Sequence, residues 1–332
     1  MTWVVWRLYR TSGIASAAAL AAFAVLLLIT GLQVATEYHN ALHACTAART
    51  CGDLASTLNL GGNTGHIFVG LSVAVPAILG MFWGAPTVAR EIEAGTSQLA
   101  WMQSVTRIRW LAVKTGWLVI AAAIWGGAVA ALVTWWSGPE NAVSLDRFNP
   151  NVFDLQGIVP VGYAIFAVAL GIAAGTLVRR TLPALAITLG GFVALRIVIA
   201  YYLRPHYLHA LTLTQSLAST LTPKGASWQL TTGIVNASGA AVPQPGSGAF
   251  LGLGPVSLSV SAVQAACRGQ IANGQPQRMV SCLSAQGLRQ YMTYQPAGHY
   301  WPFQFIETGI FLALAAALIA VTLFLVVRRI DA

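Results

Sequence analysis

Charged residues are scarce in this chain of 332 residues, which has 18 basic and 9 acidic side chains, together 8% of the sequence. Ordinary soluble domains carry about 25% charged residues, because a water-exposed surface requires them. The chain also lacks the low hydrophobicity of a disordered protein, since 56% of its residues are hydrophobic. These two absences exclude a soluble globule and a disordered chain, and they indicate that most of the sequence lies in a lipid bilayer.

Catalytic and nucleotide-binding motifs are absent as well. A P-loop needs Gly-Lys at the end of a glycine-rich turn, whereas the two lysines of this chain follow Val113 and Pro223. None of the six histidines has the His-Glu-x-x-His spacing of zinc hydrolases, and there is no Gly-x-Ser-x-Gly nucleophile elbow. We therefore predict no catalytic residue, no metal site and no ATPase activity for this chain by itself.

Six apolar runs each have about 20 residues, the length that crosses a ~30 Å hydrocarbon core as a helix. Lipid permits only helices or closed barrels, and these runs lack the alternating pattern of barrel strands. The predicted fold class is therefore an all-α membrane protein with six transmembrane helices. The expected spans are residues 12–35, 63–84, 115–137, 157–178, 183–204 and 303–327.

Basic residues are unevenly divided between the two sets of connecting segments. The segments on the side of both termini have ten basic residues in 50 positions, whereas the opposite segments have six in 144. Because positive charge favours the cytoplasmic side, both termini are predicted to lie in the cytoplasm, in a multi-pass protein of the cell membrane. Residues 1–204 then form five helices with a cytoplasmic segment at 85–114, residues 205–302 form an extracellular insertion, and residues 303–332 form the last helix and tail.

All four cysteines fall in the segments predicted to be extracellular, where oxidising conditions favour disulfides. Two local bridges, Cys45 with Cys51 and Cys267 with Cys282, are the simplest of the three possible pairings. Free thiols are the alternative.

Two charged residues lie well inside the predicted spans. Arg196 is in the fifth run, and Glu307 is near the start of the sixth. A charge in lipid costs roughly 2.5–3.5 kcal/mol on insertion scales, so such residues usually pair or line a cavity. Arginine can extend along the span, and we therefore expect Arg196 to pair with Glu307, with a substrate contact as the alternative.

Two pairs of glycines have the small-xxx-small spacing that allows helices to pack closely. They are Gly80 with Gly84, in the second run, and Gly171 with Gly175, in the fourth. In a chain with 32 glycines, this spacing is a weak signal.

The segment between the second and third spans carries the clearest motif. Glu91 and Glu93 precede Gly95, which breaks the helical pattern, and Thr96 can cap a short helix that follows. Apolar residues at helical spacing, Leu99 among them, would give that helix a face for a partner protein. The segment ends in Ser104-Val105-Thr106-Arg107.

This segment resembles the cytoplasmic coupling region of ABC-2 type transporter permeases, in which Glu-x-Glu-x-Gly-Thr opens a short helix that ends in a Pro-Val-Ser-Arg-like turn. Glu91 to Thr96 match the first element in full, and Ser104 stands where the family often has proline. The six-span layout is similar too, and the richness in Ala, Gly and Trp is similar to actinobacterial members. Relatives carry re-entrant helices before the last span, so the insertion is expected to hold such helices near its start; the short apolar stretch 250–263 is another candidate.

The resemblance implies a permease subunit that pairs with a second permease chain, expected to form a homodimer, and with a separate ABC ATPase subunit that holds ATP and Mg. The expected cargo is a small amphipathic or hydrophobic molecule, such as a drug, an antibiotic or a lipid-like compound, and no nucleic-acid partner is implied. Two alternatives stay open: an ion-coupled secondary carrier, and a membrane sensor or scaffold that binds an ATPase without transport. The implied ATPase-coupling residues are Glu91, Glu93, Gly95, Thr96, Leu99 and Arg107.

Overall fold

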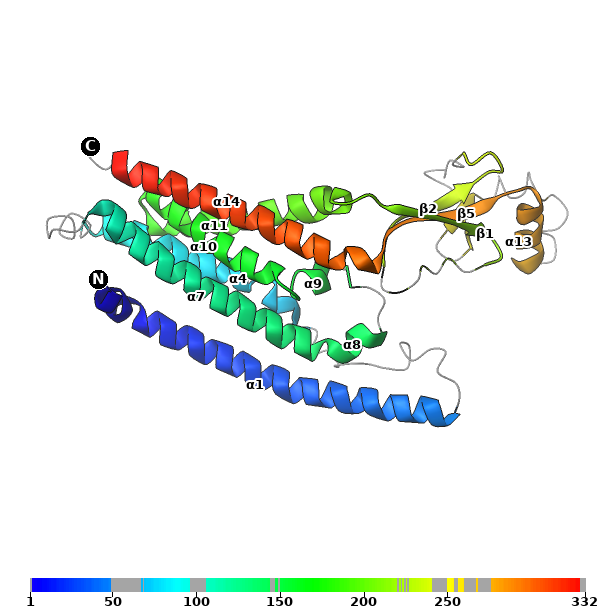
Figure 1. Ribbon diagram of the computed structural model, residues 1–332, viewed down its shortest axis with the longest axis horizontal. Coiled ribbons are helices and arrows are strands. Elements are labelled where there is room, and N and C mark those ends of the chain that lie inside the picture. Colours follow the sequence, from blue (N-terminus) through cyan, green and yellow to red (C-terminus); the bar gives the residue numbers. More distant parts are fainter. Residues whose placement is uncertain are drawn as a thin grey trace. The chain divides into compact units, whose positions relative to one another are not determined.

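The computed structural model describes residues 2–48, 67, 69–95, 106–143, 147–148, 150–219, 221, 223, 225, 227–240, 250–253, 256–259, 267 and 276–328. The chain forms two compact units, and Figure 1 labels their longer elements. The helical unit comprises Met1–Ser144, Asn149–Arg204 and Trp301–Ala332, and the insertion unit comprises Leu145–Phe148 and Pro205–Tyr300.

Long helices dominate the helical unit. In chain order, the α-helices are α1 (Thr2–Ala48), α4 (Val75–Leu79), α5 (Ala85–Glu93), α7 (Arg107–Trp136), α8 (Gly138–Val143), α9 (Pro150–Phe153), α10 (Val159–Val178), α11 (Thr181–Val198) and α14 (Tyr300–Arg328). Two π-helices continue α-helices without a break: η1 (Gly80–Gly84) joins α4 to α5, and η2 (Ile199–Leu203) extends α11 and leads into the 3-10 helix η3 (Arg204–His206).

Five helical stretches in the described part of the chain are long and apolar enough to cross a membrane. They are Gly13–Thr46, Ile108–Trp136, Val159–Val178, Thr181–His206 and Ala297–Val327. These stretches overlap the first and the third to sixth predicted spans, although α1 continues beyond residue 35 to Ala48. The second predicted span, residues 63–84, lies partly outside the described residues, and its described end contains α4 and η1.

The α10 helix is the centre of the helical unit. Most of its residues are buried, and it contacts α4, η1, α5, α7 and α11. Its sequence explains this position, because α10 contains no charged residue and has small residues where other helices cross it.

The two glycine pairs meet where α10 crosses η1 and the start of α5. A Cβ atom at Gly84 would lie 2.6 Å from the Val168 carbonyl oxygen, and one at Gly171 would lie 2.7 Å from the Ala85 nitrogen. Real Cβ atoms essentially never approach other atoms closer than 3.0 Å, so only glycine fits at these positions. The close packing predicted from the small-xxx-small spacing is therefore confirmed, and it brings two backbones into direct contact.

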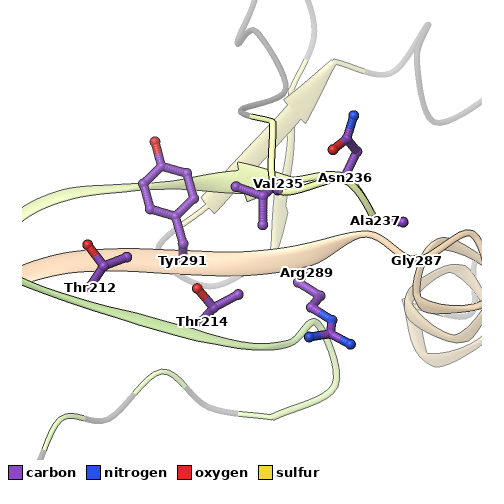
Figure 2. A pocket seen from close by; sticks show the side chains of 9 residues that line it. Thr212, Thr214, Val235, Asn236, Ala237, Gly287, Arg289 and Tyr291 are labelled. Carbon is purple, nitrogen blue, oxygen red and sulfur yellow. The ribbon is translucent and has the colours of Figure 1, made fainter.

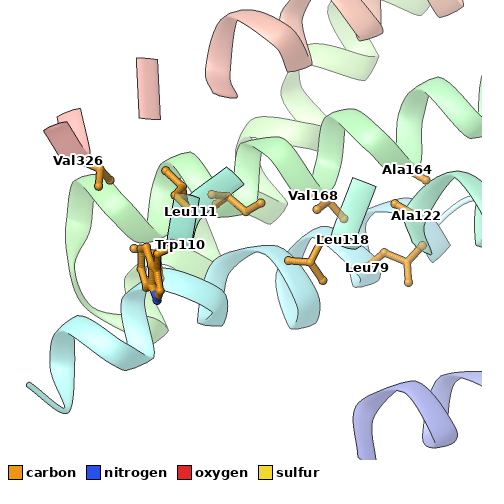
Figure 3. Close-up of a cluster of buried hydrophobic side chains, with 10 residues drawn as sticks. Leu79, Trp110, Leu111, Leu118, Ala122, Ala164, Val168 and Val326 are labelled. Carbon is orange, nitrogen blue, oxygen red and sulfur yellow. The ribbon is translucent and has the colours of Figure 1, made fainter. Parts of the chain in front are cut away.

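Apolar side chains from α4, α5, α7, α10 and α14 form the main core of the helical unit. Figure 3 shows Leu79, Leu118 and Val168 together in this cluster, with Trp110 and Val326 also contributing. A second apolar cluster joins α1 to α7. These two helices are also linked by a hydrogen bond from Trp136 Nε1 to Thr30 Oγ1 at 3.0 Å.

The insertion unit contains strands, so the all-α prediction is wrong for this part of the chain. A three-stranded antiparallel sheet has the order β1 (Leu211–Ser216), β5 (Arg289–Gln295) and β2 (Trp228–Val235). Residues 250–253 and 256–259, part of the stretch considered as a re-entrant helix, instead form the paired strands β3 (Phe250–Leu253) and β4 (Val256–Ser259). Alternation such as Leu-Thr-Leu-Thr in β1 favours strand over helix. The remaining elements are α13 (Pro276–Ala285) and the 3-10 helix η5 (Ala297–His299).

One of the two predicted disulfides is fully described. Cys267 and Cys282 are bonded, which attaches Cys267 to α13. Cys45 is also disulfide-bonded, whereas Cys51, its predicted partner, lies outside the described residues.

Candidate functional site

Five ionisable side chains gather inside the helical unit, and we call this group the buried charge cluster. Asp154 follows α9, Tyr163 is in the first turns of α10, Arg196 is near the end of α11, Arg204 follows η2, and Glu307 is in the third turn of α14. Arg204 and Glu307 are each 0% exposed. The cluster therefore joins segments that are far apart in sequence and lie on three candidate membrane spans.

Arg204 is the centre of the buried charge cluster. Its guanidinium donates two parallel hydrogen bonds to Glu307, from Nε to Oε2 at 2.8 Å and from Nη2 to Oε1 at 2.6 Å, and Nη2 also donates to Asp154 Oδ1. Its flat face lies over the Phe153 ring, 4.4 Å from the centroid. Bidentate arginine–carboxylate pairs are among the strongest protein hydrogen bonds, and this one connects η3 to α14.

Arg196 and Tyr163 complete the buried charge cluster. Arg196 Nη2 donates to Asp154 Oδ2 at 2.7 Å, and Nη1 donates to the Val73 carbonyl at 3.0 Å. The Tyr163 hydroxyl lies within hydrogen-bonding distance of both Asp154 and Glu307. Because a phenol has one proton, it can donate to only one of the two carboxylates at a time.

The buried charge cluster is electrically balanced. Two arginines face two carboxylates, so the group has no net charge, as expected for charged side chains that remain within a membrane protein. Burial of each ion costs several kcal/mol, and only the complete set of ion pairs and hydrogen bonds offsets that cost. The arrangement therefore depends on every member.

A glutamine beside the buried charge cluster fixes the start of α10. The Gln304 Oε1 atom accepts hydrogen bonds from the Ile158 and Val159 amides at 3.0 and 3.1 Å, and Nε2 donates to the Phe153 carbonyl at 3.1 Å. The first amides of a helix have no intrahelical partner, so a side chain of α14 supplies the cap. Gly157, with φ +71°, makes the turn that lets Gln304 approach.

The cavity beside the buried charge cluster is too small for cargo. It is lined by Asp154, Tyr163 and Arg196, among others, and has room for about 10 Å³, the space of one water molecule. In this conformation the cluster therefore joins helices and does not surround a substrate.

The structure corrects the expected partner of Arg196. Its carboxylate is Asp154 and not Glu307, which binds Arg204 instead. Sequence reasoning had assigned Asp154 to a connecting segment and Arg204 to the last position of a span, so neither was considered as a partner. Asp154 lies just before one apolar run and Arg204 at the end of another. A charged residue at such a border is the sequence signal that could have identified them as partners.

A second set of contacts surrounds the Glu91–Glu93 motif, and we call it the helix clamp. Glu91 pairs with the Lys114 ammonium on α7, and Lys114 also lies over the Trp110 ring, 4.3 Å from the centroid. Glu93 Oε2 accepts hydrogen bonds from the Thr181 amide at 3.2 Å and from the Thr181 hydroxyl at 2.7 Å, at the first residue of α11. The helix clamp thus ties the end of α5 to the first turns of α7 and α11.

Electrostatics favour the ionised form of Glu93. The two hydrogen bonds from Thr181, and less strongly the charge of Arg180, hold the pKa of the Glu93 carboxyl below its ordinary value. A carboxylate at a helix N-terminus is also stabilised by the unpaired amides there. Glu93 therefore acts as a charged cap for α11.

Gly95 ends α5, as the sequence predicted. Its φ is +68°, a left-handed conformation that favours glycine, and its amide donates to the Ile92 carbonyl at 3.1 Å. Thr96 and Leu99 lie outside the described residues, and Arg107 is the first residue of α7. Thr106 caps α7 by accepting a hydrogen bond from the Arg109 amide at 3.4 Å.

Several long apolar helices packed around a buried, charge-balanced group define a multi-pass membrane protein. The chain belongs to the family described as ABC-2 membrane transporter related, whose model matches residues 17–204, which are 188 of the 332 residues. This membership confirms the resemblance seen in the motif, and it implies an ABC ATPase subunit as partner. No curated protein and no solved structure matches the chain.

Proposed function

We propose that the chain is the permease subunit of an ATP-driven exporter of small amphipathic or hydrophobic molecules. It has six spans, with residues 63–84 as the second, and both termini are cytoplasmic. Two copies form a homodimer, and each copy binds a separate ATPase subunit that holds ATP and Mg. The family match supports this proposal, as does the excess of basic residues in the segments next to the termini.

The observation that carries the coupling role is the helix clamp. Residues 96–105, which would contact the ATPase, connect α5 to α7, and the helix clamp joins α5 to α7 and α11. A movement of this segment is therefore passed directly to the first turns of two candidate spans. For such a movement to drive transport, the cargo must bind the two states of the permease with different affinity.

The pairing of the buried acids favours this function over an ion-coupled carrier. A secondary carrier usually has an acid near the middle of the membrane that binds and releases the coupling ion. Among the described residues, Asp154 lies just before the span of α10 and Glu307 lies in the span of α14, and both carboxylates bind Arg204. These two acids are engaged with arginine and are poorly suited to carry protons or sodium.

Reconstitution with the ATPase tests the proposal. The chain should capture an ATPase subunit when purified from its native host, and inverted vesicles that contain both proteins should accumulate cargo in a vanadate-sensitive way. Uptake that needs a proton gradient but no ATP would replace the proposal with the carrier. ATPase capture without any cargo movement would replace it with the scaffold.

Two substitutions test the coupling segment within that assay. Glu93→Ala removes the cap of α11, and Gly95→Pro forbids the positive φ at the end of α5. Each should reduce substrate-stimulated ATPase activity about fivefold or more, the lower limit of typical coupling energies, while membrane insertion is unchanged. Gly190→Ala is the control, because a Cβ atom there meets nothing within 4 Å. Unchanged stimulation in both variants would contradict a coupling role for this segment.

A further inference from the structure

The β1–β5–β2 sheet of the insertion unit has two unlike faces. Directly paired residues share a face of an antiparallel sheet, and the register places Thr214, Tyr291 and Gly233 in one row. The opposite face carries Met292 and Ile234, which are 0% and 1% exposed, and forms the core of the unit. The face with Tyr291 is therefore the one that other molecules can reach.

A groove of about 490 Å³ lies on this reachable face. Its volume is within the range of about 300–1,000 Å³ that is usual for small-molecule sites. Figure 2 shows that the Tyr291 ring lies toward β2 and the Arg289 side chain toward β1. The side chains that the groove offers to a ligand include Thr212, Thr214, Arg289 and Tyr291.

The Tyr291 ring lies against the backbone of Gly233, which has no side chain to displace it. A Cβ atom at Gly233 would lie 2.6 Å from Tyr291 Cε1, so the ring lies directly across the glycine. The ring is thus supported by backbone and presents its other face to the groove. An aromatic face beside threonine hydroxyls suits a ligand that is partly apolar and partly hydroxylated.

The charge of the groove is positive and has no counter-ion nearby in sequence. Residues 205–302 contain four basic side chains and no aspartate or glutamate. Arg289 lines the groove, and it makes no ion pair with the described residues. Its guanidinium is therefore available to bind a carboxylate or a phosphate with two parallel hydrogen bonds.

We propose that this groove binds a small hydroxylated anion, of the class of sugar phosphates and sugar acids. Arg289 pairs with the phosphate or carboxylate, Thr212 and Thr214 bond to hydroxyl groups, and the sugar ring lies against Tyr291. The same chemistry occurs in a free metabolite and in the headgroup of an inositol lipid. The groove residues belong to the insertion unit, and none of them is part of the helix clamp.

Binding of glucose 6-phosphate to the full chain tests this site. The chain is placed in phosphatidylcholine nanodiscs, and saturation-transfer NMR follows the sugar protons during a titration, with glucose as the uncharged comparison. Glucose 6-phosphate should bind saturably and more tightly than glucose. Arg289→Gln should weaken binding about tenfold or more, because a charge-assisted bidentate pair is lost. Thr214→Val, which keeps the shape of the side chain, should weaken it about two- to fivefold.

Arg147→Gln is the matched control, because it removes the same charge from the same unit. Arg147 lies over the Tyr300 ring, 5.6 Å from the centroid, and should be replaceable without loss of binding. Equal losses in Arg147→Gln and Arg289→Gln, or no saturable binding to the wild-type chain up to about 10 mM, would overturn the proposal.

A second series of nanodiscs distinguishes the two sources of the anion. Phosphatidylinositol in the bilayer should compete with glucose 6-phosphate if a lipid headgroup is the natural occupant. It should leave the titration unchanged if the occupant is a soluble molecule. Either outcome supports the site, provided that Arg289→Gln abolishes the difference between glucose 6-phosphate and glucose.

Discussion

The buried charge cluster and the helix clamp use the same residue types in opposite ways. In the cluster, Arg204 and Glu307 are removed from solvent, and their charges are balanced by one another and by their neighbours. In the clamp, Lys114 is buried, but the Glu91 side chain is 20% exposed and Glu93 is exposed. Exposed ion pairs contribute little and are screened by salt, whereas a broken buried pair is strongly destabilising. The comparison indicates that the cluster holds its helices more firmly than the clamp does, because only the Glu91–Lys114 half of the clamp is largely buried.

The largest effect is expected where a single member of the buried charge cluster is removed. Arg204→Met leaves the Glu307 carboxylate buried without its arginine, and we expect a loss of about 3–5 kcal/mol. The apparent unfolding temperature in detergent and the yield of membrane-inserted protein measure this loss.

A double substitution separates charge balance from packing in the same experiment. Arg204→Met combined with Glu307→Leu leaves Arg196 and Asp154 as a neutral pair, so it should be more stable than Arg204→Met alone. If the double variant is less stable than either single variant, pairing of charges does not explain the cluster.

Hydropathy predicted much of the helical unit because lipid imposes a simple rule. A run of about 20 apolar residues must be a helix, and five such helices are present in the described residues. The glycine spacing pointed to two segments that pack closely, because only glycine permits such contacts, but it did not predict that these two segments pack against each other. The strands of the insertion unit were missed, since a search for long apolar runs does not detect the two-residue alternation of segments such as Leu211–Ser216.

The pairing of residues within the buried charge cluster could not be predicted from the sequence, for a different reason. Asp154 and Arg204 are 50 residues apart and meet only because α10, α11 and α14 pack together. The similar depth of Arg196 and Glu307 in their predicted spans favoured a pair between them. In the structure, Arg196 instead forms its ion pair with Asp154. In contrast, the end of α5 was predictable, because Gly95 ends a helix by local geometry. The clamp partners Lys114 and Thr181 were not predicted, because they also lie on other helices.

An intermediate effect is expected at the buried half of the helix clamp. Glu91→Gln leaves the Lys114 ammonium buried and unpaired, whereas Lys114→Met leaves a carboxylate that reaches solvent. We expect losses of about 1–3 kcal/mol, with Glu91→Gln the more harmful of the two. Chemical denaturation in mixed micelles measures both variants. The reverse order would mean that the packing of Lys114 on Trp110, and not its charge, holds α7 to α5.

The smallest effect is expected at the exposed half of the helix clamp, and it should depend on pH. Because the pKa of Glu93 is lowered from its ordinary 4.5, its cap on α11 is fully present above that value and is lost as the pH falls through the lowered pKa. Hydrogen exchange of peptides that begin at Thr181 should be faster in Glu93→Gln than in the wild-type chain near neutral pH, and the difference should shrink in acid. Glu37→Gln, a change at an exposed residue of α1, should alter neither. A difference that persists below the lowered pKa would show that the Glu93 side chain supports α11 by its shape and not by its charge.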